Sequence, residues 1–187
     1  ISAMGLGLCR IDLGKMVLRF KHLGARYQSA RQFVRSELGE EFFNTDRGPE
    51  KPKDIVLYGF GRIGRVLTRL LIAATGPGRF FRLRGVIVRG KGDAEDLEKR
   101  AELLRHDSVH GPFSGLIDNV PEQSELVVNG NRVKFIFADD PSAVDYHALG
   151  FDDVIVVDNS GRWRDRVGLT RHLRPGVSRV ALTAPGK

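Results

Sequence analysis

The sequence predicts an α/β protein with a doubly wound, mostly parallel sheet, preceded by an N-terminal helical extension. Three observations predict this fold. Short apolar runs alternate with amphipathic stretches from residue 54 onward, which is typical of a parallel sheet with helices on its faces. A glycine cluster stands between the first apolar run and the first amphipathic stretch. Before residue 44 the pattern shows only helical periodicity.

The composition is that of a globular protein without a membrane span. Hydrophobic residues make up 41% of the chain, but no apolar run approaches the roughly 18 residues that a membrane helix needs. The only cysteine, Cys9, excludes an internal disulfide and a cysteine-cluster zinc site, and we predict no metal site. A single cysteine also fits a reducing compartment, so we expect a cytoplasmic protein. The net charge of +7 favours polyanions such as phosphates, nucleotides or RNA, without choosing among them.

The extension, residues 1–43, is expected to contain one amphipathic helix over residues 12–38. Its apolar positions recur three and four residues apart; they are Met16, Phe20, Leu23, Tyr27, Ala30, Val34 and Leu38. Basic residues occupy the other faces, and no acidic residue occurs between Leu13 and Ser36. This pattern fits a packing helix with a solvated face, but also an organellar targeting segment or a membrane-surface helix. A polar linker, residues 44–53, separates the extension from the main domain, residues 54–187.

The main domain alternates predicted strands and helices. The expected strands are 55–58, 83–88, 154–157 and 180–182, of which the last two should be buried. The expected helices are 63–74, stopped by "TGPG" at 75–78, then 92–107 and 164–173. Segments 126–128 and 133–137 flank the "NGN" turn and predict a β-hairpin that interrupts the alternation.

The glycine cluster predicts a dinucleotide site. Gly59, Gly61 and Gly64 form a GxGxxG pattern between the first strand and the first helix. At such a turn the first glycine makes the tight bend, the second lets a pyrophosphate approach the main-chain N–H groups, and the third lets the helix pack on the strand. The pattern alone is a weak signal. Here, however, a strand, a helix and a second strand flank it in the order of a Rossmann-like fold.

Six stretches then carry a specific resemblance. In chain order they are "YGFGRIGR", "LLRHDSVHGPFSG", "VNG", "DPSAVDY", "VVDNSGRWRDRVGLTRHL" and "VALTAPGK". In this order they resemble the N-terminal, coenzyme-binding half of phosphorylating glyceraldehyde-3-phosphate dehydrogenases. The helical extension is similar to that of the longer, N-terminally extended members. The resemblance implies a glycolytic oxidoreductase that passes a hydride from glyceraldehyde 3-phosphate to NAD or NADP and takes up inorganic phosphate to give 1,3-bisphosphoglycerate. It further implies a homo-oligomer with no nucleic-acid partner and no integral membrane contact.

The resemblance also implies which residues bind the coenzyme. The residues that resemble those around the pyrophosphate are Gly59, Phe60, Gly61, Arg62 and Ile63, with Gly64 completing the motif. Ser160 and Gly161 resemble the turn after the fourth parallel strand. Thr183 resembles the hydroxyl residue near the nicotinamide side. For His110 in "DSVHG" we expect a structural role.

At the end of the second strand the chain departs from the family. Arg89 and Gly90 stand where NAD-using members carry asparagine and aspartate, and Lys91 follows. The aspartate normally accepts hydrogen bonds from the ribose hydroxyls, whereas cations suit a 2′-phosphate. We therefore expect NADP to be accepted, alongside NAD; the alternative is that these are solvated loop charges. Asp139 is a further departure, because many members carry an arginine there, near the adenine.

No catalytic residue is predicted. In the family the nucleophilic cysteine lies in an "SCTTN" stretch and its partner histidine lies further on; neither motif occurs in these 187 residues. Cys9 and the remaining histidines lack a comparable context. We expect a fragment that binds nucleotide and catalyses nothing. The alternative is a non-catalytic nucleotide- or RNA-binding assembly module on the same fold. A related semialdehyde dehydrogenase does not readily account for the six stretches.

Overall fold

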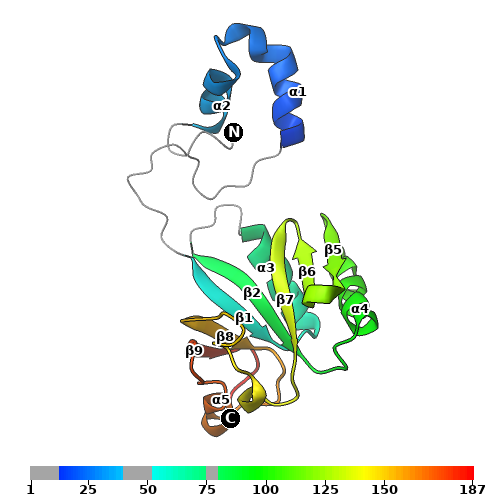
Figure 1. Ribbon diagram of the computed structural model, residues 1–187, viewed down its shortest axis with the longest axis vertical. Helices are drawn as coiled ribbons and strands as arrows, with labels where there is room; N and C mark the ends of the chain where they lie inside the picture. Colours follow the sequence, from blue (N-terminus) through cyan, green and yellow to red (C-terminus); the bar gives the residue numbers. More distant parts are fainter. Residues whose placement is uncertain (1–12, 40–51, 75–79) are drawn as a thin grey trace. The chain divides into compact units, whose positions relative to one another are not determined.

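The computed structural model describes residues 13–39, 52–74 and 80–187, which fall into two compact units (Figure 1). The smaller unit holds the N-terminal helices, and the larger one comprises residues 53–73 and 81–187. Cys9, the predicted "TGPG" stop and most of the predicted linker lie outside the described residues.

The N-terminal unit is a helical hairpin. Helix α1 (Leu13–Leu23) leads into a single 3-10 turn, η2 (Gly24–Arg26), and helix α2 (Ala30–Leu38) follows. The predicted continuous helix is therefore wrong. Ser29 has an extended backbone, and its hydroxyl accepts a hydrogen bond from the Gln32 amide at 3.2 Å. This N-cap starts a new helix where the periodicity alone predicted continuation.

Aromatic packing closes the hairpin. Phe33 of α2 is only 1% exposed, and its ring lies 5.1 Å from that of Phe20 and 5.3 Å from that of Tyr27. Arg19 and Glu37 join the two helices by an ion pair of 2.9 Å. Phe33, which lies outside the predicted apolar period, is thus the centre of this packing, and of the periodic residues only Val34 is buried.

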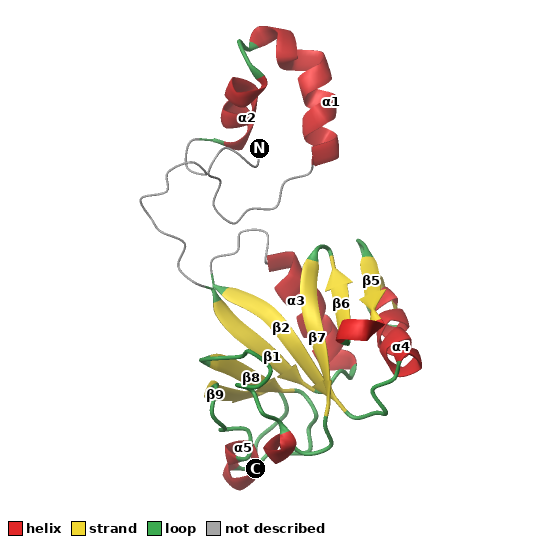
Figure 2. Ribbon diagram, in the orientation of Figure 1, coloured by secondary structure: helices red, strands yellow, loops and turns green. Residues whose placement is uncertain are grey.

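The larger unit is built on one main sheet (Figure 2). Within the described residues seven strands form it, in the order β5-β6-β7-β2-β1-β8-β9. The strands are β1 (Lys53–Tyr58), β2 (Phe81–Val88), β5 (Ile117–Val120), β6 (Glu125–Val128), β7 (Asn131–Phe137), β8 (Val154–Asp158) and β9 (Val177–Leu182). Strands β7, β2, β1, β8 and β9 are parallel neighbours, and β5 and β6 add an antiparallel edge. The predicted fold class is confirmed.

Helices and short elements complete this unit. They are α3 (Arg62–Ala74), α4 (Ala94–Arg105), α5 (Arg166–Thr170), the 3-10 turns η4 (Pro121–Gln123) and η5 (Pro141–Ala143), and a two-stranded ribbon of β3 (His106–Asp107) and β4 (Gly111–Pro112). From β1 the chain proceeds to β2 and β7 on one side, then returns to β8 on the other. In open α/β sheets such a reversal marks the crevice, outside the carboxyl ends of the strands, where ligands bind.

The core has one layer on each face of the sheet, because successive side chains of a strand point to opposite faces. Ile55 and Leu57 of β1 pack in the layer that also contains residues of α3 and α4. Val56 and Tyr58 face the other layer, which the β7–β8 connection covers with residues such as Tyr146 and Phe151. Strand β1 is thereby buried on both faces, and its carboxyl end is held firmly in place.

The hairpin prediction is confirmed, and two others need correction. Strands β6 and β7 are joined by Asn129 and Gly130, both with positive φ, as a two-residue hairpin turn requires. The helix predicted over 164–173 is shorter, because Asp165 caps it and it ends at Thr170. The last strand is longer than predicted and mostly exposed, not buried, because β9 is the outermost strand of its side.

Candidate functional site

The turn after β1 lies directly against the turn after β8. Gly59 has φ +100°, and a Cβ atom there would stand 3.1 Å from the Ser160 amide nitrogen and 3.3 Å from the Asn159 carbonyl carbon. The Asn159 side-chain amide donates to the Gly59 carbonyl at 3.4 Å. On the other side, the Gly59 amide donates to the Ile87 carbonyl of β2 at 2.8 Å. Glycine is required at this position both by its backbone conformation and by the contact between main chains.

Gly61 and Gly64 have opposite surroundings. A Cβ atom at Gly64 would lie 2.3 Å from the Gly59 carbonyl oxygen, so α3 starts in direct contact with the turn. A Cβ atom at Gly61 would meet nothing within 4 Å, so this side of the turn is open. The first turn of α3 contains no acidic residue, and Arg62 and Ile63 are exposed. An open main chain at a helix N-terminus fits a diphosphate, because the free N–H groups and the helix dipole attract anions.

Phe60 has a different role from its neighbours. Its side chain is 5% exposed, and its ring packs edge-on against Phe135 with centroids 5.2 Å apart. Any contact of this residue with a coenzyme would therefore come from its main chain. The aromatic ring instead anchors the turn in the core.

The candidate residues that follow β8 and β9 share hydrogen-bond partners. One carboxylate oxygen of Asp158 accepts hydrogen bonds from the Ser160 amide and hydroxyl, both at 2.7 Å. The Thr183 hydroxyl donates to the Asp158 carbonyl at 3.2 Å and lies 3.3 Å from the Asn159 side-chain oxygen. Gly161 has φ +67° and open space around it. The structure thus brings Ser160, Gly161 and Thr183 together beside the glycine turn.

The Asp158 side chain is also hydrogen-bonded to a buried histidine, His172. The second carboxylate oxygen of Asp158 lies 3.0 Å from Nε2 of His172, and both side chains are 0% exposed. A carboxylate only accepts hydrogen bonds, so Nε2 is the donor. The Tyr58 ring packs edge-on against His172 at 4.7 Å, and burial raises the pKa of the Tyr58 hydroxyl. The hydrogen bond from His172 thus holds the Asp158 carboxylate, which in turn accepts the hydrogen bonds of Ser160.

The predicted residues at the end of β2 lie in a separate loop. Arg89, Gly90 and Lys91 are all exposed, and Gly90 has φ +152°. The Lys91 amide donates to a carboxylate oxygen of Asp96 at 3.1 Å. Arg100 of α4 donates to the Arg89 carbonyl at 2.9 Å. These contacts hold the main chain of the loop and leave its cationic side chains directed to solvent.

Comparison with known proteins identifies the domain. Residues 53–166 match the model of the NAD binding domain of glyceraldehyde 3-phosphate dehydrogenase. The chain belongs to the glyceraldehyde-3-phosphate dehydrogenase family. The matched residues are an NAD-binding domain of the Rossmann type, which agrees with the sheet order and with the open glycine turn.

The relatives that this chain matches are longer than the chain itself. A glyceraldehyde-3-phosphate dehydrogenase-like protein of Pseudomonas aeruginosa is 49% identical over 188 residues, covering 100% of this chain and 40% of the relative. The glyceraldehyde-3-phosphate dehydrogenase of Thermotoga maritima is 32% identical over 71% of this chain and 37% of its own length. The chloroplastic enzyme A of Chlamydomonas reinhardtii is 30% identical over 88% and 38%, respectively. The chain therefore spans about two fifths of the relatives it matches, and the Pseudomonas match includes the helical hairpin.

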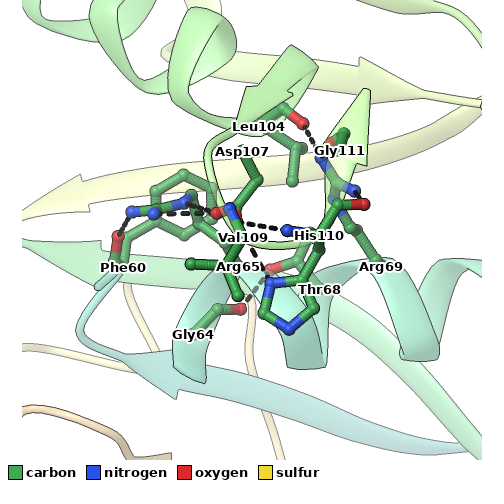
Figure 3. Close-up of polar contacts among 10 residues, drawn as sticks. All are labelled: Phe60, Gly64, Arg65, Thr68, Arg69, Leu104, Asp107, Val109, His110 and Gly111. Atoms are coloured by element: carbon green, nitrogen blue, oxygen red, sulfur yellow. Dashed lines mark hydrogen bonds and ion pairs between the residues drawn. The ribbon is translucent and has the colours of Figure 1, made fainter. Parts of the chain in front are cut away.

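The "DSVHG" stretch of this family member holds α3 in place (Figure 3). Asp107 accepts hydrogen bonds from Nε and Nη2 of Arg65 at 2.9 and 2.8 Å. Its other oxygen accepts from the Val109 and His110 amides, both at 3.0 Å, and faces Nδ1 of His110 at 3.1 Å. The hydrogen bonds donated by the main-chain amides of His110 and Val109, and then by the Arg65 side chain, keep the pKa of Asp107 well below its ordinary value. His110 thus takes part in this contact through both its amide and its ring.

A second arginine of α3 extends this contact. Arg69 donates to the carbonyls of Leu104 at 2.8 Å and Gly111 at 2.9 Å. Sequence reasoning missed Arg65, Arg69 and Asp107 as a group. The signal that could have found them is the spacing of two arginines four residues apart on a helix, which places both on one face.

Two other types of site are relevant to the described part of the chain, a membrane-spanning helix and a cluster of metal ligands. None of its helices combines the length and the hydrophobicity that a membrane span requires. Across residues 13–39, 52–74 and 80–187, no three histidine, cysteine, aspartate or glutamate side chains are grouped as metal ligands.

Proposed function

We propose that this chain is the coenzyme-binding part of a dehydrogenase. The intact enzyme would oxidise glyceraldehyde 3-phosphate, with inorganic phosphate, to 1,3-bisphosphoglycerate. This chain would bind NAD but would not catalyse the reaction by itself. The observation that supports the proposal best is the open main chain at Gly61, placed where β1 gives way to α3 and where the strand order reverses. The family match to residues 53–166 supports the coenzyme.

Each part of the site has a distinct task in this proposal. The amides of the turn and of the first turn of α3 would hold the pyrophosphate, with Arg62 beside it. Gly64 lets α3 approach closely enough for those amides to point at the phosphates. The hydroxyls of Ser160 and Thr183 each donate to Asp158, so in this proposal they would face the nicotinamide side as hydrogen-bond acceptors. When bound, the coenzyme supplies the hydride acceptor.

The proposed lack of catalysis is supported by what the described residues lack. Residues 13–39, 52–74 and 80–187 contain no cysteine, and Cys9 is outside them. The described histidines therefore have no thiol beside them to activate. A covalent aldehyde oxidation needs an activated nucleophile beside a base. We therefore place the nucleophile and its base elsewhere in an intact enzyme, which we propose to be a cytoplasmic homo-oligomer.

Calorimetric titration of the 187-residue chain with NAD⁺ tests the proposal. We expect saturable heat from the wild type and at least about tenfold weaker binding by Gly61→Ala, whose added methyl group would lie where the phosphate approaches. A folded wild-type protein, as judged by circular dichroism, that gives no heat with NAD⁺ contradicts the proposal.

Two further measurements separate the alternatives. Incubation with glyceraldehyde 3-phosphate, phosphate and NAD⁺ should produce no NADH, and turnover would show that the chain is catalytic. A chain that binds RNA tightly, without competition from NAD⁺, would instead be an assembly module.

A further inference from the structure

We propose that helix α1 docks on an anionic lipid surface, which its exposed aliphatic side chains enter and to which its positive charge is attracted. This inference goes beyond the proposed coenzyme function and concerns only the N-terminal unit. Helix α1 has 11 residues, too few to cross a bilayer, so it would lie in the headgroup region, parallel to the surface.

The outer side of α1 carries three large aliphatic side chains. Leu13 is 56% exposed, Val17 54% and Leu18 58%. The helical hairpin does not bury them, because the aromatic packing around Phe33 closes it on another side of α1. Leu13 and Val17 are four residues apart and therefore lie side by side on the helix surface. Helix α1 thus presents apolar area that the hairpin itself leaves uncovered.

The N-terminal unit also has a strong excess of positive charge. Residues 13–39 contain six lysine and arginine residues but only one acidic residue, Glu37, which pairs with Arg19 at 2.9 Å. Lys21 is exposed and forms no ion pair within the described residues. It follows Val17 by four residues and Leu18 by three, so its ammonium group lies beside both. Positive charge and aliphatic area therefore share one face of α1.

This combination fits an anionic lipid surface better than the other candidate occupants. A second copy would bring two positively charged hairpins together, which is unfavourable. A single-stranded nucleic acid is bound through cations and stacking aromatic rings, and gains little from exposed leucine and valine side chains. At a lipid surface, by contrast, aliphatic side chains enter the acyl boundary, while lysine stems extend to the headgroup phosphates.

Co-sedimentation of the 187-residue chain with lipid vesicles tests the proposal. Phosphatidylcholine vesicles that contain about 30% phosphatidylglycerol should bind the chain at low ionic strength, and added salt should weaken the binding. Vesicles of phosphatidylcholine alone should bind it at least about tenfold more weakly, because the electrostatic attraction is lost.

Substitutions on α1 separate the apolar and the electrostatic contributions. The double variant Val17→Gln/Leu18→Gln should weaken vesicle binding about tenfold or more, because it removes two aliphatic side chains from the acyl boundary. Lys21→Gln should weaken it about fivefold, because it removes one charge near the surface. All three side chains are exposed, so these variants should keep the fold, which circular dichroism will check.

Matched controls make the same kinds of change in the larger unit. Leu116→Gln replaces an aliphatic side chain that is 74% exposed, and Arg174→Gln removes an exposed charge. Each should change vesicle binding by less than about twofold, because neither residue lies on the docking face. NAD⁺ binding should also stay within about twofold of the wild type in all of these variants, since the proposed coenzyme site lies in the larger unit.

The outcomes either support or overturn the docking face. Loss of vesicle binding in Val17→Gln/Leu18→Gln, with both controls unchanged, supports it. A folded wild-type chain that does not sediment with the phosphatidylglycerol vesicles overturns it, and so does equal binding by the wild type and the double variant. Binding to poly(U) or polyglutamate without binding to vesicles would assign α1 to a soluble polyanion and also overturns it. Because NAD⁺ binding is measured separately, the proposed coenzyme function stands or falls independently.

Discussion

Asp107 and Arg65 join two segments that are 42 residues apart in sequence. The Arg65 guanidinium donates twice to one carboxylate oxygen of Asp107, at 2.8 and 2.9 Å, and also reaches the Phe60 carbonyl at 3.4 Å. The arginine is 12% exposed and the aspartate 1%. Through this pair the segment after α4 is joined both to α3 and to the Phe60 carbonyl of the glycine turn.

Removing the charge of Asp107 should loosen this attachment. Asp107→Asn leaves a nearly buried guanidinium without its counter-ion, and such changes are strongly destabilising. We expect the melting temperature to fall by about 5 °C or more, measured by differential scanning calorimetry. Asp118→Asn, an exposed aspartate on β5, is the matched control and should shift it by less than about 1 °C. Equal shifts in the two variants would contradict the role of Asp107.

The same carboxylate should make stability depend on acid. Its pKa is depressed in the folded state from an ordinary value of 3.8. A depressed carboxyl pKa contributes stability that is fully present above the unfolded-state value and is lost as the pH falls toward the folded-state value. Urea unfolding of the wild type should therefore show stability falling steadily below about pH 4. The fall should be shallower in Asp107→Asn, and an equally steep fall would contradict this cause.

The second and third glycines of the motif, Gly61 and Gly64, should respond differently to an added methyl group. Gly64→Ala would bring Cβ to 2.3 Å from the Gly59 carbonyl oxygen, so α3 must move. We expect it to cost about 1–3 kcal/mol of unfolding free energy. Gly61→Ala has open space and no positive φ, so its stability should stay within about 0.5 kcal/mol of the wild type.

Urea denaturation of both variants, alongside NAD⁺ titration, separates the two effects. Both should lose NAD⁺ affinity, but only Gly64→Ala should lose stability. A stable Gly64→Ala protein with wild-type affinity would show that α3 can shift without cost.

The buried pair of Asp158 and His172 should be essential for the order of the Ser160 turn. His172→Ala leaves a buried carboxylate without one of its donors, and we expect a loss of about 3 kcal/mol in urea denaturation. His172→Gln, which can still donate, should recover part of that loss. His147→Ala, at an exposed histidine, is the control and should be nearly neutral. A neutral His172→Ala would mean that Ser160 alone satisfies the carboxylate.

Features set by neighbouring residues were predictable from the sequence. The glycine turn, the Asn129-Gly130 hairpin and the strands β1 and β2 each depend on local backbone requirements or on an uninterrupted apolar run. The open space at Gly61 and the tight contact at Gly64 agree with the tasks that their spacing suggested.

Features that depend on distant partners were not predictable. Nothing local indicates that Asp107 meets Arg65 or that His172 meets Asp158, because each pair forms only when the sheet is assembled. Phe60 lies inside a coenzyme motif, yet its ring packs against that of Phe135, which is 75 residues further along the sequence. In the N-terminal unit, the cap at Ser29 overrode a regular apolar period.

Strand β9 has a practical consequence for every measurement proposed above. In the described chain it is the last strand on its side, paired only with β8, so one row of its main-chain N–H and C=O groups has no strand to bond. A free strand edge can pair with another copy of itself. Samples at high protein concentration should then form sheet-linked dimers or larger aggregates, and light scattering across a dilution series will show where such self-association ends.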